Sequence, residues 1–209
     1  ADISESAIEA GVRGVLSLCA KGCVDRAHIG VQGHSWGGYQ TAYMITKSNL
    51  FAAAEAGAPV VNMTSAYGGI RWGTGMVRQF QYEHTQTRIG GTLWEKLPLY
   101  LENSPLFFAP KIQTPLLMMH NDADTAVPWY QGIEFFTALR RLNKPVWMVV
   151  YNDQQHGLSR KADQRDWAIR MQQFFDHYLK GAPAPVWMQE GVPATLKGKT
   201  LGLEPAGGR

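Results

Sequence analysis

The chain has 209 residues, a length typical of one domain that buries a hydrophobic core of its own. Hydrophobic residues make up 45% of the sequence and charged residues 18%, which excludes an intrinsically disordered chain. The formal net charge is only +3, so nucleic acid is not expected as a partner. No stretch reaches the ~18 consecutive apolar residues of a membrane-spanning helix, so no membrane span is expected.

The two cysteines and the first residues carry little functional information. Cys19 and Cys23 are four apart, a spacing that fits neither a zinc site nor a thioredoxin-like motif, and we expect two ordinary thiols. The first five residues contain no basic segment followed by an apolar one, so no signal peptide is visible. Because the chain does not begin with Met, any signal peptide would precede Ala1, and the sequence leaves the compartment open.

The first predicted element is a helix over residues 3–18, where apolar side chains recur at steps of three and four. Asp2 or Ser4 is expected to cap it, and Gly22 is expected to break it. Residues 28–32 are then predicted to form a short buried strand.

A tight turn is predicted from Gly33 to Gly38, and residues 39–48 are predicted to form a helix. Small residues over 51–58 indicate a strand that stops at Pro59. From residue 60 to residue 111 the pattern is irregular and rich in glycines and aromatic residues. We interpret this stretch as a long insertion of loops and short helices that shapes a pocket.

Regular periodicity returns in the second half of the chain. Residues 115–120 and 146–151 are apolar runs typical of buried strands. An amphipathic helix is predicted between them, over 129–142. A final helix is predicted over 163–179 and is expected to end at Gly181.

Together these elements indicate an α/β fold. The strands are continuous apolar runs that alternate with helices, a combination typical of a parallel sheet covered by helices on both faces. Residues 1–181 are therefore predicted to form one α/β region. Residues 182–209 are rich in proline and glycine and are predicted to be a tail.

The strongest local signal is the G-x-S-x-G motif of Gly33-His34-Ser35-Trp36-Gly37, which lies between a predicted strand and a predicted helix. A serine hydroxyl must project from a sharp turn to meet both a base and a substrate carbonyl, and flanking glycines leave room for that turn. The Trp36 backbone amide would then face the developing oxyanion. The alternative is a glycine-rich turn with a capping serine.

A serine nucleophile requires an acid and a histidine, each placed just after a strand. His156 follows the strand at 146–151, which makes it the candidate general base. Asp122 and Asp124 both follow the strand that ends at His120, and we favour Asp124 as the acid, with Asp122 stabilising the loop. His120, Asp122 and Asp124 also resemble metal ligands. Alternate residues rarely converge on one ion, however, and no metal is expected.

These residues resemble a known family. The motif Gly33–Tyr39, then His120, Asp124 and Val127-Pro128, and then His156-Gly157 are similar to the catalytic domain of the prolyl oligopeptidase family of serine peptidases. The resemblance covers about residues 1–181 and implies the α/β-hydrolase fold. It implies Ser35 as nucleophile, Asp124 as acid, His156 as base and the Trp36 amide as one oxyanion donor. It also implies peptide substrates and no cofactor.

The resemblance is incomplete in three respects. A tyrosine hydroxyl that supplies the family's second oxyanion donor, and a β-propeller, would both lie upstream of residue 1. Ala126 stands where the dipeptidyl peptidases carry asparagine, so their specificity is not implied. Tyr39, Val127 and Tyr67 are the candidates for the substrate pocket, with core packing as the alternative for each.

We therefore expect a serine-type peptidase, with a carboxylesterase of the same fold or a non-catalytic hydrolase-like module as alternatives. Only four strands are predicted, about half of those that the resemblance implies. We therefore expect the chain to be the C-terminal piece of a longer hydrolase. Its first strand would then have an exposed edge, at which a second copy of the chain is a candidate partner.

Overall fold

The computed structural model describes residues 8–207. Its centre is a four-stranded sheet in the order β1-β2-β5-β6, in which every neighbouring pair is parallel. The strands are β1 (Gly30–His34), β2 (Ala53–Gly57), β5 (Leu116–Met119) and β6 (Val146–Val149). Within the described part of the chain, β1 and β6 form the two edges of this sheet.

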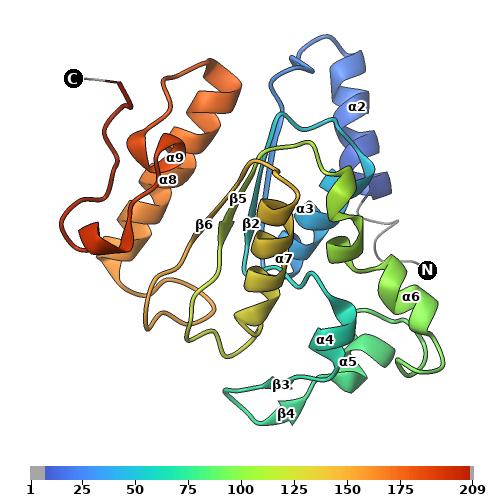
Figure 1. Ribbon diagram of the computed structural model, residues 1–209. Coiled ribbons are helices and arrows are strands. Elements are labelled where there is room, and N and C mark those ends of the chain that lie inside the picture. Colours follow the sequence, from blue (N-terminus) through green and yellow to red (C-terminus); the bar gives the residue numbers. More distant parts are fainter. Residues whose placement is uncertain (1–7, 208–209) are drawn as a thin grey trace.

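Helices cover both faces of the sheet (Figure 1). One face is covered by α3 (Trp36–Lys47), α7 (Tyr130–Arg141) and the 3-10 helix η2 (Pro105–Lys111), with η1 (Ile8–Val12) and α2 (Arg13–Ala20) beside α3. The other face is covered by α8 (Lys161–Lys180) and α9 (Val186–Gln189). This arrangement confirms the predicted α/β architecture.

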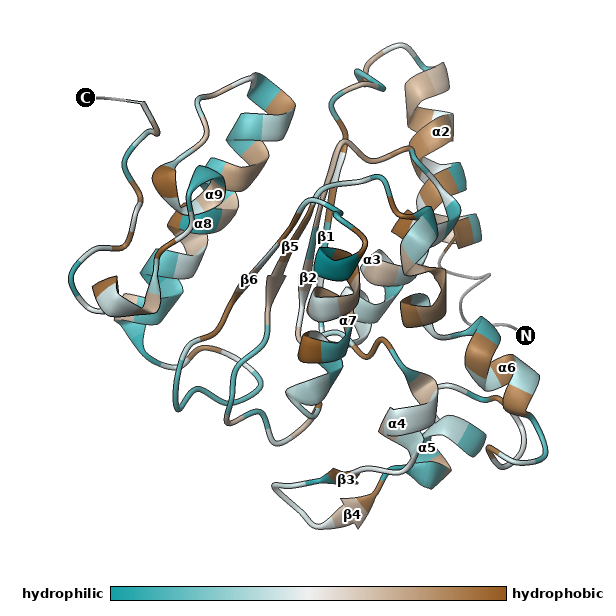
Figure 2. Cartoon of the chain, in the orientation of Figure 1, coloured by the Kyte–Doolittle hydropathy of each residue, from teal (hydrophilic) through white to brown (hydrophobic). Residues whose placement is uncertain are grey.

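The core divides into two layers because alternate residues of a strand point to opposite faces. On β2 and β5, Ala54, Ala56, Leu116 and Met118 pack toward α3 and α7. Their neighbours in sequence, such as Leu117 and Met119, pack toward α8. Figure 2 shows the resulting hydrophobic colour along β5 and β6. The continuous apolar pattern of these strands therefore follows from burial on both faces.

The first strand differs from its prediction in position and in burial. It begins at Gly30 rather than residue 28, because the Asp25 side chain accepts a hydrogen bond from the Ala27 amide and closes a turn ahead of the strand. Its residues alternate between exposed and half-buried, so the expectation of a buried strand was wrong. The physical reason is its place at an edge of the sheet. The predicted caps Asp2 and Ser4 lie outside the described residues.

The irregular segment 60–111 contains short helices, as expected, and one feature that the sequence did not indicate. Its helices are η2, α4 (Met63–Tyr67), α5 (Gln79–Glu83) and α6 (Leu97–Glu102). Between α4 and α5 lies a two-stranded antiparallel ribbon of β3 (Ile70–Arg71) and β4 (Met76–Val77).

The segment after Gly181 packs against the α8 face of the sheet. It contains α9 and the 3-10 helix η3 (Ala194–Leu196). Trp187 is buried there, and the Trp147 indole donates a hydrogen bond to the Met188 carbonyl at 2.8 Å. Among the residues that the structure describes, no helix has the length and apolar character needed to cross a membrane.

Candidate active site

Ser35 lies on the turn between β1 and α3, and its backbone is strained. Its φ of 60° and ψ of −116° are values that non-glycine residues rarely adopt. The glycines around it are required by close packing of the backbone. A Cβ on Gly33 would lie 2.3 Å from the Gly37 carbonyl oxygen, and one on Gly38 would lie 2.4 Å from the Gly57 carbonyl oxygen. The turn is thus tight enough to raise the Ser35 hydroxyl above the sheet.

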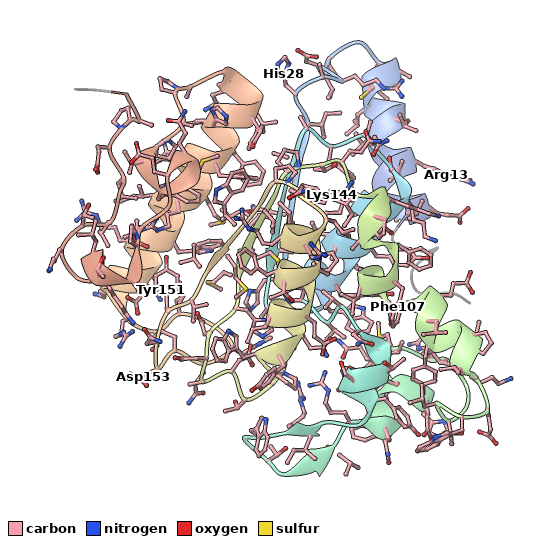
Figure 3. All side chains as sticks on the ribbon, in the orientation of Figure 1. Arg13, His28, Phe107, Lys144, Tyr151 and Asp153 are labelled. Carbon is pink, nitrogen blue, oxygen red and sulfur yellow. The ribbon has the colours of Figure 1, made fainter. Side chains whose placement is uncertain are left out.

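Three side chains from three loops meet at the carboxyl edge of the sheet. His156 Nε2 lies 2.8 Å from Ser35 Oγ, and His156 Nδ1 lies 2.8 Å from Asp124 Oδ2. The loops follow β1, β5 and β6, and parallel strands bring their carboxyl ends to one edge. Figure 3 labels Tyr151 and Asp153 in the loop that carries His156, at the opposite end of the sheet from His28. The structure thus brings together the three residues predicted from the sequence.

Asp124 is fully buried and surrounded by donors. Its Oδ1 accepts hydrogen bonds from the Ala126 and Val127 amides at 2.8 and 2.9 Å. Burial alone would raise the pKa of Asp124, but hydrogen bonds from His120, His156 and the Val127 amide hold that pKa well below its usual range. The carboxylate is therefore ionised and oriented toward His156.

Asp122, the alternative acid, is not among the hydrogen-bond partners of His156. Its carboxylate accepts hydrogen bonds from the Asn152 side chain at 2.6 Å and from the Asp153 amide at 2.8 Å. Asn121 bonds the same loop, because its side-chain amide donates to the Gln155 carbonyl at 2.8 Å. Asp122 and Asn121 therefore tie the loop after β5 to the loop that carries His156. Of the two, only Asp122 was anticipated in this role.

Two further buried side chains stabilise the loop that carries Asp124, residues 120–128, which we call the acid loop. The sequence did not indicate either role. Arg78 is 1% exposed and donates hydrogen bonds to the Ala126 carbonyl and, at 3.1 Å, to the Tyr82 hydroxyl. His120 Nε2 lies 3.1 Å from the Val127 carbonyl oxygen. His120 was visible in the sequence through its position at the end of a predicted strand and its place in the family motif, four residues before Asp124, but neither signal indicated this role. Arg78 had no signal, because it lies 48 residues from its partner.

Two further titratable groups, His34 and Glu55, lie close to the turn that carries Ser35. The His34 and His156 rings pack with their centroids 4.9 Å apart. Burial, followed by the nearby His156, lowers the pKa of His34. On β2, Glu55 is 5% exposed, and its burial raises its pKa to about 8, opposed by a hydrogen bond from the Gly33 backbone. Glu55 is therefore a protonated carboxyl at neutral pH.

The three candidate pocket residues share one buried cluster. Tyr39 is 0% exposed, Tyr67 3% and Val127 4%, and they pack with Tyr82 and Tyr100. The cluster adjoins the triad, because Tyr39 follows Ser35 by one helical turn and the Val127 amide binds Asp124. All three side chains are therefore buried in the core, as the core-packing alternative expects.

The remaining predicted group is the oxyanion donor. Trp36 is the first residue of α3, so its amide is one of those that have no acceptor within the helix. Among residues 8–207, no group of three or more His, Cys, Asp or Glu side chains is placed to hold a metal ion.

Comparison with known proteins places the chain among peptidases. Similarity extends to the uncharacterized peptidase YuxL of Bacillus subtilis, 30% identical over 159 residues, which are 75% of this chain and 23% of that protein. The acylamino-acid-releasing enzyme of Homo sapiens is 29% identical over 137 residues, 65% of this chain and 18% of the enzyme. The chain thus spans about a fifth of the length of these two relatives.

The fold is also similar to that of solved peptidase structures. A puromycin-hydrolyzing peptidase of Mycobacterium tuberculosis superposes with a TM-score of 0.75 at 22% identity, over 83% of this chain and 25% of that one. A family model described as the prolyl oligopeptidase family matches residues 7–182. The chain therefore belongs to the prolyl oligopeptidase family, peptidase family S9.

Proposed function

We propose that the chain is the catalytic region of a serine peptidase that cleaves peptide bonds through an acyl-enzyme on Ser35. The observation that carries the proposal is the hydrogen-bonded series Ser35–His156–Asp124, with both contacts at 2.8 Å. Membership of a peptidase family supports amide hydrolysis as the reaction.

In the first half of the reaction, Ser35 Oγ attacks the carbonyl carbon of the scissile peptide bond. His156 Nε2 takes the hydroxyl proton as the new bond forms and gives it to the leaving amine as the peptide bond breaks. Asp124 keeps the other ring proton on Nδ1 and stabilises the imidazolium. In the second half, a water molecule attacks the ester of Ser35, its proton passes through His156, and the acid product leaves.

The negative charge that develops on the carbonyl oxygen requires donors that are already in place. The Trp36 amide is the first donor, because it lies next to the nucleophile at the N-terminus of α3. By resemblance, the second donor is a tyrosine hydroxyl from a segment that precedes this chain in the longer relatives.

The proposed substrate class is peptides, and the buried side chains of Tyr39, Val127 and Tyr67 are proposed to shape the surroundings of the residue before the scissile bond from beneath the surface. These side chains belong to a buried cluster rich in aromatic residues, against which Trp36, the residue after Ser35, packs. An apolar or aromatic residue at that position of the substrate suits these surroundings better than a charged one.

The test is a side-by-side assay of peptide-amide and aryl-ester hydrolysis by the purified full-length protein that contains this chain, with Ser35→Ala as the control. We expect turnover of both substrates, and loss of both in the variant while the fold is retained. Hydrolysis of esters with no detectable amide turnover would indicate a carboxylesterase of the same fold. Failure of a fluorophosphonate to label Ser35 in the full-length protein would indicate a non-catalytic module.

A further inference from the structure

His120 is a second imidazole on the triad acid. It follows β5, is 0% exposed, and directs Nε2 between two oxygens. Nε2 lies 3.1 Å from the Val127 carbonyl oxygen and 3.5 Å from Asp124 Oδ2. Asp124 Oδ2 is the oxygen that also binds His156 Nδ1 at 2.8 Å. One carboxylate oxygen is therefore shared by two histidines.

The neighbours of His120 determine where its proton lies. Both partners of Nε2 are acceptors, so Nε2 must carry the proton to bond either of them. Nδ1 is buried and has no hydrogen-bond partner among the described residues. A protonated Nδ1 would be a buried donor without an acceptor, which is unfavourable. These contacts assign His120 as the neutral tautomer with its hydrogen on Nε2.

The fold holds this ring in place from the opposite side. A Cβ on Gly132 of α7 would lie 2.6 Å from His120 Nδ1. Gly132 thus allows α7 to press directly on the ring, and the ring cannot move away from Asp124 without entering the helix.

We propose that His120 is a positioning residue for the triad, which fixes the Asp124 carboxylate and withdraws part of its negative charge from His156. The proposal rests on the proposed roles of Asp124 and His156. The contact of His120 Nε2 with the shared oxygen, at 3.5 Å, makes that oxygen a weaker acceptor for His156. His120 thereby weakens the interaction between the Asp124 carboxylate and His156 Nδ1.

Three other polar groups also lie close to Asp124, His156 or the acid loop. His34 packs on the His156 ring from β1. Arg78 bonds the Ala126 carbonyl from the segment before α5. Ser35 contributes its hydroxyl from the catalytic turn. None of these three is replaced in the experiment below, so a change in pH dependence reports on His120.

The experiment compares His120→Asn with His120→Gln, two amides that differ by one methylene. The Gln amide reaches the position of Nε2, whereas the Asn amide is too short to do so. The readout is the rate of Ser35 labelling by a fluorophosphonate as a function of pH, together with kcat and KM on a peptide amide. The acid limb of the labelling profile reports the pKa of His156.

If His120 shares the charge of Asp124, the acid limb of His120→Asn moves to higher pH, by about half a unit. Its kcat falls about tenfold, while KM stays within about twofold. His120→Gln recovers most of both effects. If His120 only supports the loop, its loss loosens the contact between Asp124 and His156, and the limb moves to lower pH. The two roles therefore predict opposite signs.

The proposal would be overturned if the acid limb of the labelling profile moved to lower pH or stayed fixed in His120→Asn. It would also be overturned if the Asn and Gln variants had the same pH profile and the same kcat. Gly132→Ala provides a second route if His120→Asn does not fold, because the added methyl group displaces the intact ring and should move the limb upward too. His177→Gln is the matched control, since His177 also bonds a backbone carbonyl but lies on α8. If the wild-type protein does not label at all, the proposed function fails instead.

Discussion

The turn that carries Ser35 and the loop that carries Asp124 both belong to the candidate site, but their conformations are stabilised in different ways. The turn from Gly33 to Gly38 is shaped by its own backbone, because glycines lie where any Cβ would collide. The acid loop, residues 120–128, is held by side-chain hydrogen bonds, from Asp124 and His120 within the loop and from the distant Arg78. The local sequence therefore indicates the strained turn, but it does not indicate the hydrogen bond that the distant Arg78 donates to the acid loop.

The two regions also differ in the unfavourable contribution that each must offset, which is backbone strain in the turn and a buried charge in the acid loop. The turn stores strain at Ser35, whose φ is 60°, and packing of β2 against α3 keeps it there. The acid loop stores a buried negative charge, which needs several donors at once to remain ionised. The predictions below separate backbone strain in the turn from charge solvation in the acid loop.

The largest effect is expected at the acid. Asp124→Asn should lower kcat/KM about a thousandfold or more, because the amide no longer holds His156 in the correct tautomer. Asp122→Asn should lower it less than about tenfold, since Asp122 bonds the backbone and Asn152 rather than His156. Steady-state kinetics on a peptide amide measures both. A larger loss at Asp122 would refute the choice of Asp124.

The next effect tests backbone strain within one motif. Gly33→Ala should lower the free energy of unfolding by about 3 kcal/mol, because its Cβ meets the Gly37 carbonyl. Gly37→Ala should change it by less than about 1 kcal/mol, since no atom lies within 4 Å of that Cβ. Urea unfolding gives both values. Equal effects at the two glycines would show that the turn is not limited by this contact.

A smaller effect is expected where a remote side chain holds the acid loop. Arg78→Met should lower kcat/KM about tenfold and stability by about 1–3 kcal/mol, because the Ala126 carbonyl loses its buried donor. Arg88→Met is the control, since Arg88 is exposed and bonds only its own turn. If both variants keep wild-type kinetics, the acid loop does not depend on Arg78.

The smallest effect concerns Glu55 and appears only as a pH dependence. Its pKa is about 8 in the folded protein against an ordinary 4.5, so the folded state binds the proton more tightly. The resulting stabilisation is complete below about pH 4.5 and is lost as pH rises to about 8. Glu55→Gln should remove this dependence and raise Tm by about 5 °C at pH 8.5 relative to wild type.

Thermal unfolding between pH 5 and pH 9 measures this difference. The exposed residue Glu102 provides the control, and Glu102→Gln should follow the wild-type curve. Parallel curves for Glu55→Gln and wild type would contradict the assignment of a buried, protonated carboxyl at Glu55.

The fold was predictable because its signals are local and repetitive. Apolar runs such as residues 116–119 identify strands buried on both faces, and Gly181 ends α8 in the left-handed conformation, with a φ of 69°. The burial of β1 was not predictable, because it depends on which strands are its neighbours. The β3–β4 ribbon was missed for a related reason, since two residues per strand are too few to show a period.

The residues of the site likewise divide into those that the local sequence indicates and those that it does not. Ser35, Asp124 and His156 could be found because each lies just after a predicted strand, in a fixed order along the chain. Arg78 and Glu55 could not, because their importance comes from burial and from partners brought close only by folding. His120 falls between these cases. Its place before Asp124 was visible, but the direction of its Nε2 was not.

The most direct test of the account is labelling of the purified full-length protein with a fluorophosphonate, followed by peptide mapping by mass spectrometry. The account predicts one adduct, on Ser35, which is absent in Ser35→Ala and forms much more slowly in His156→Ala. An adduct on another residue, or labelling of Ser35 at an unchanged rate without His156, would contradict the assignment of this nucleophile and base.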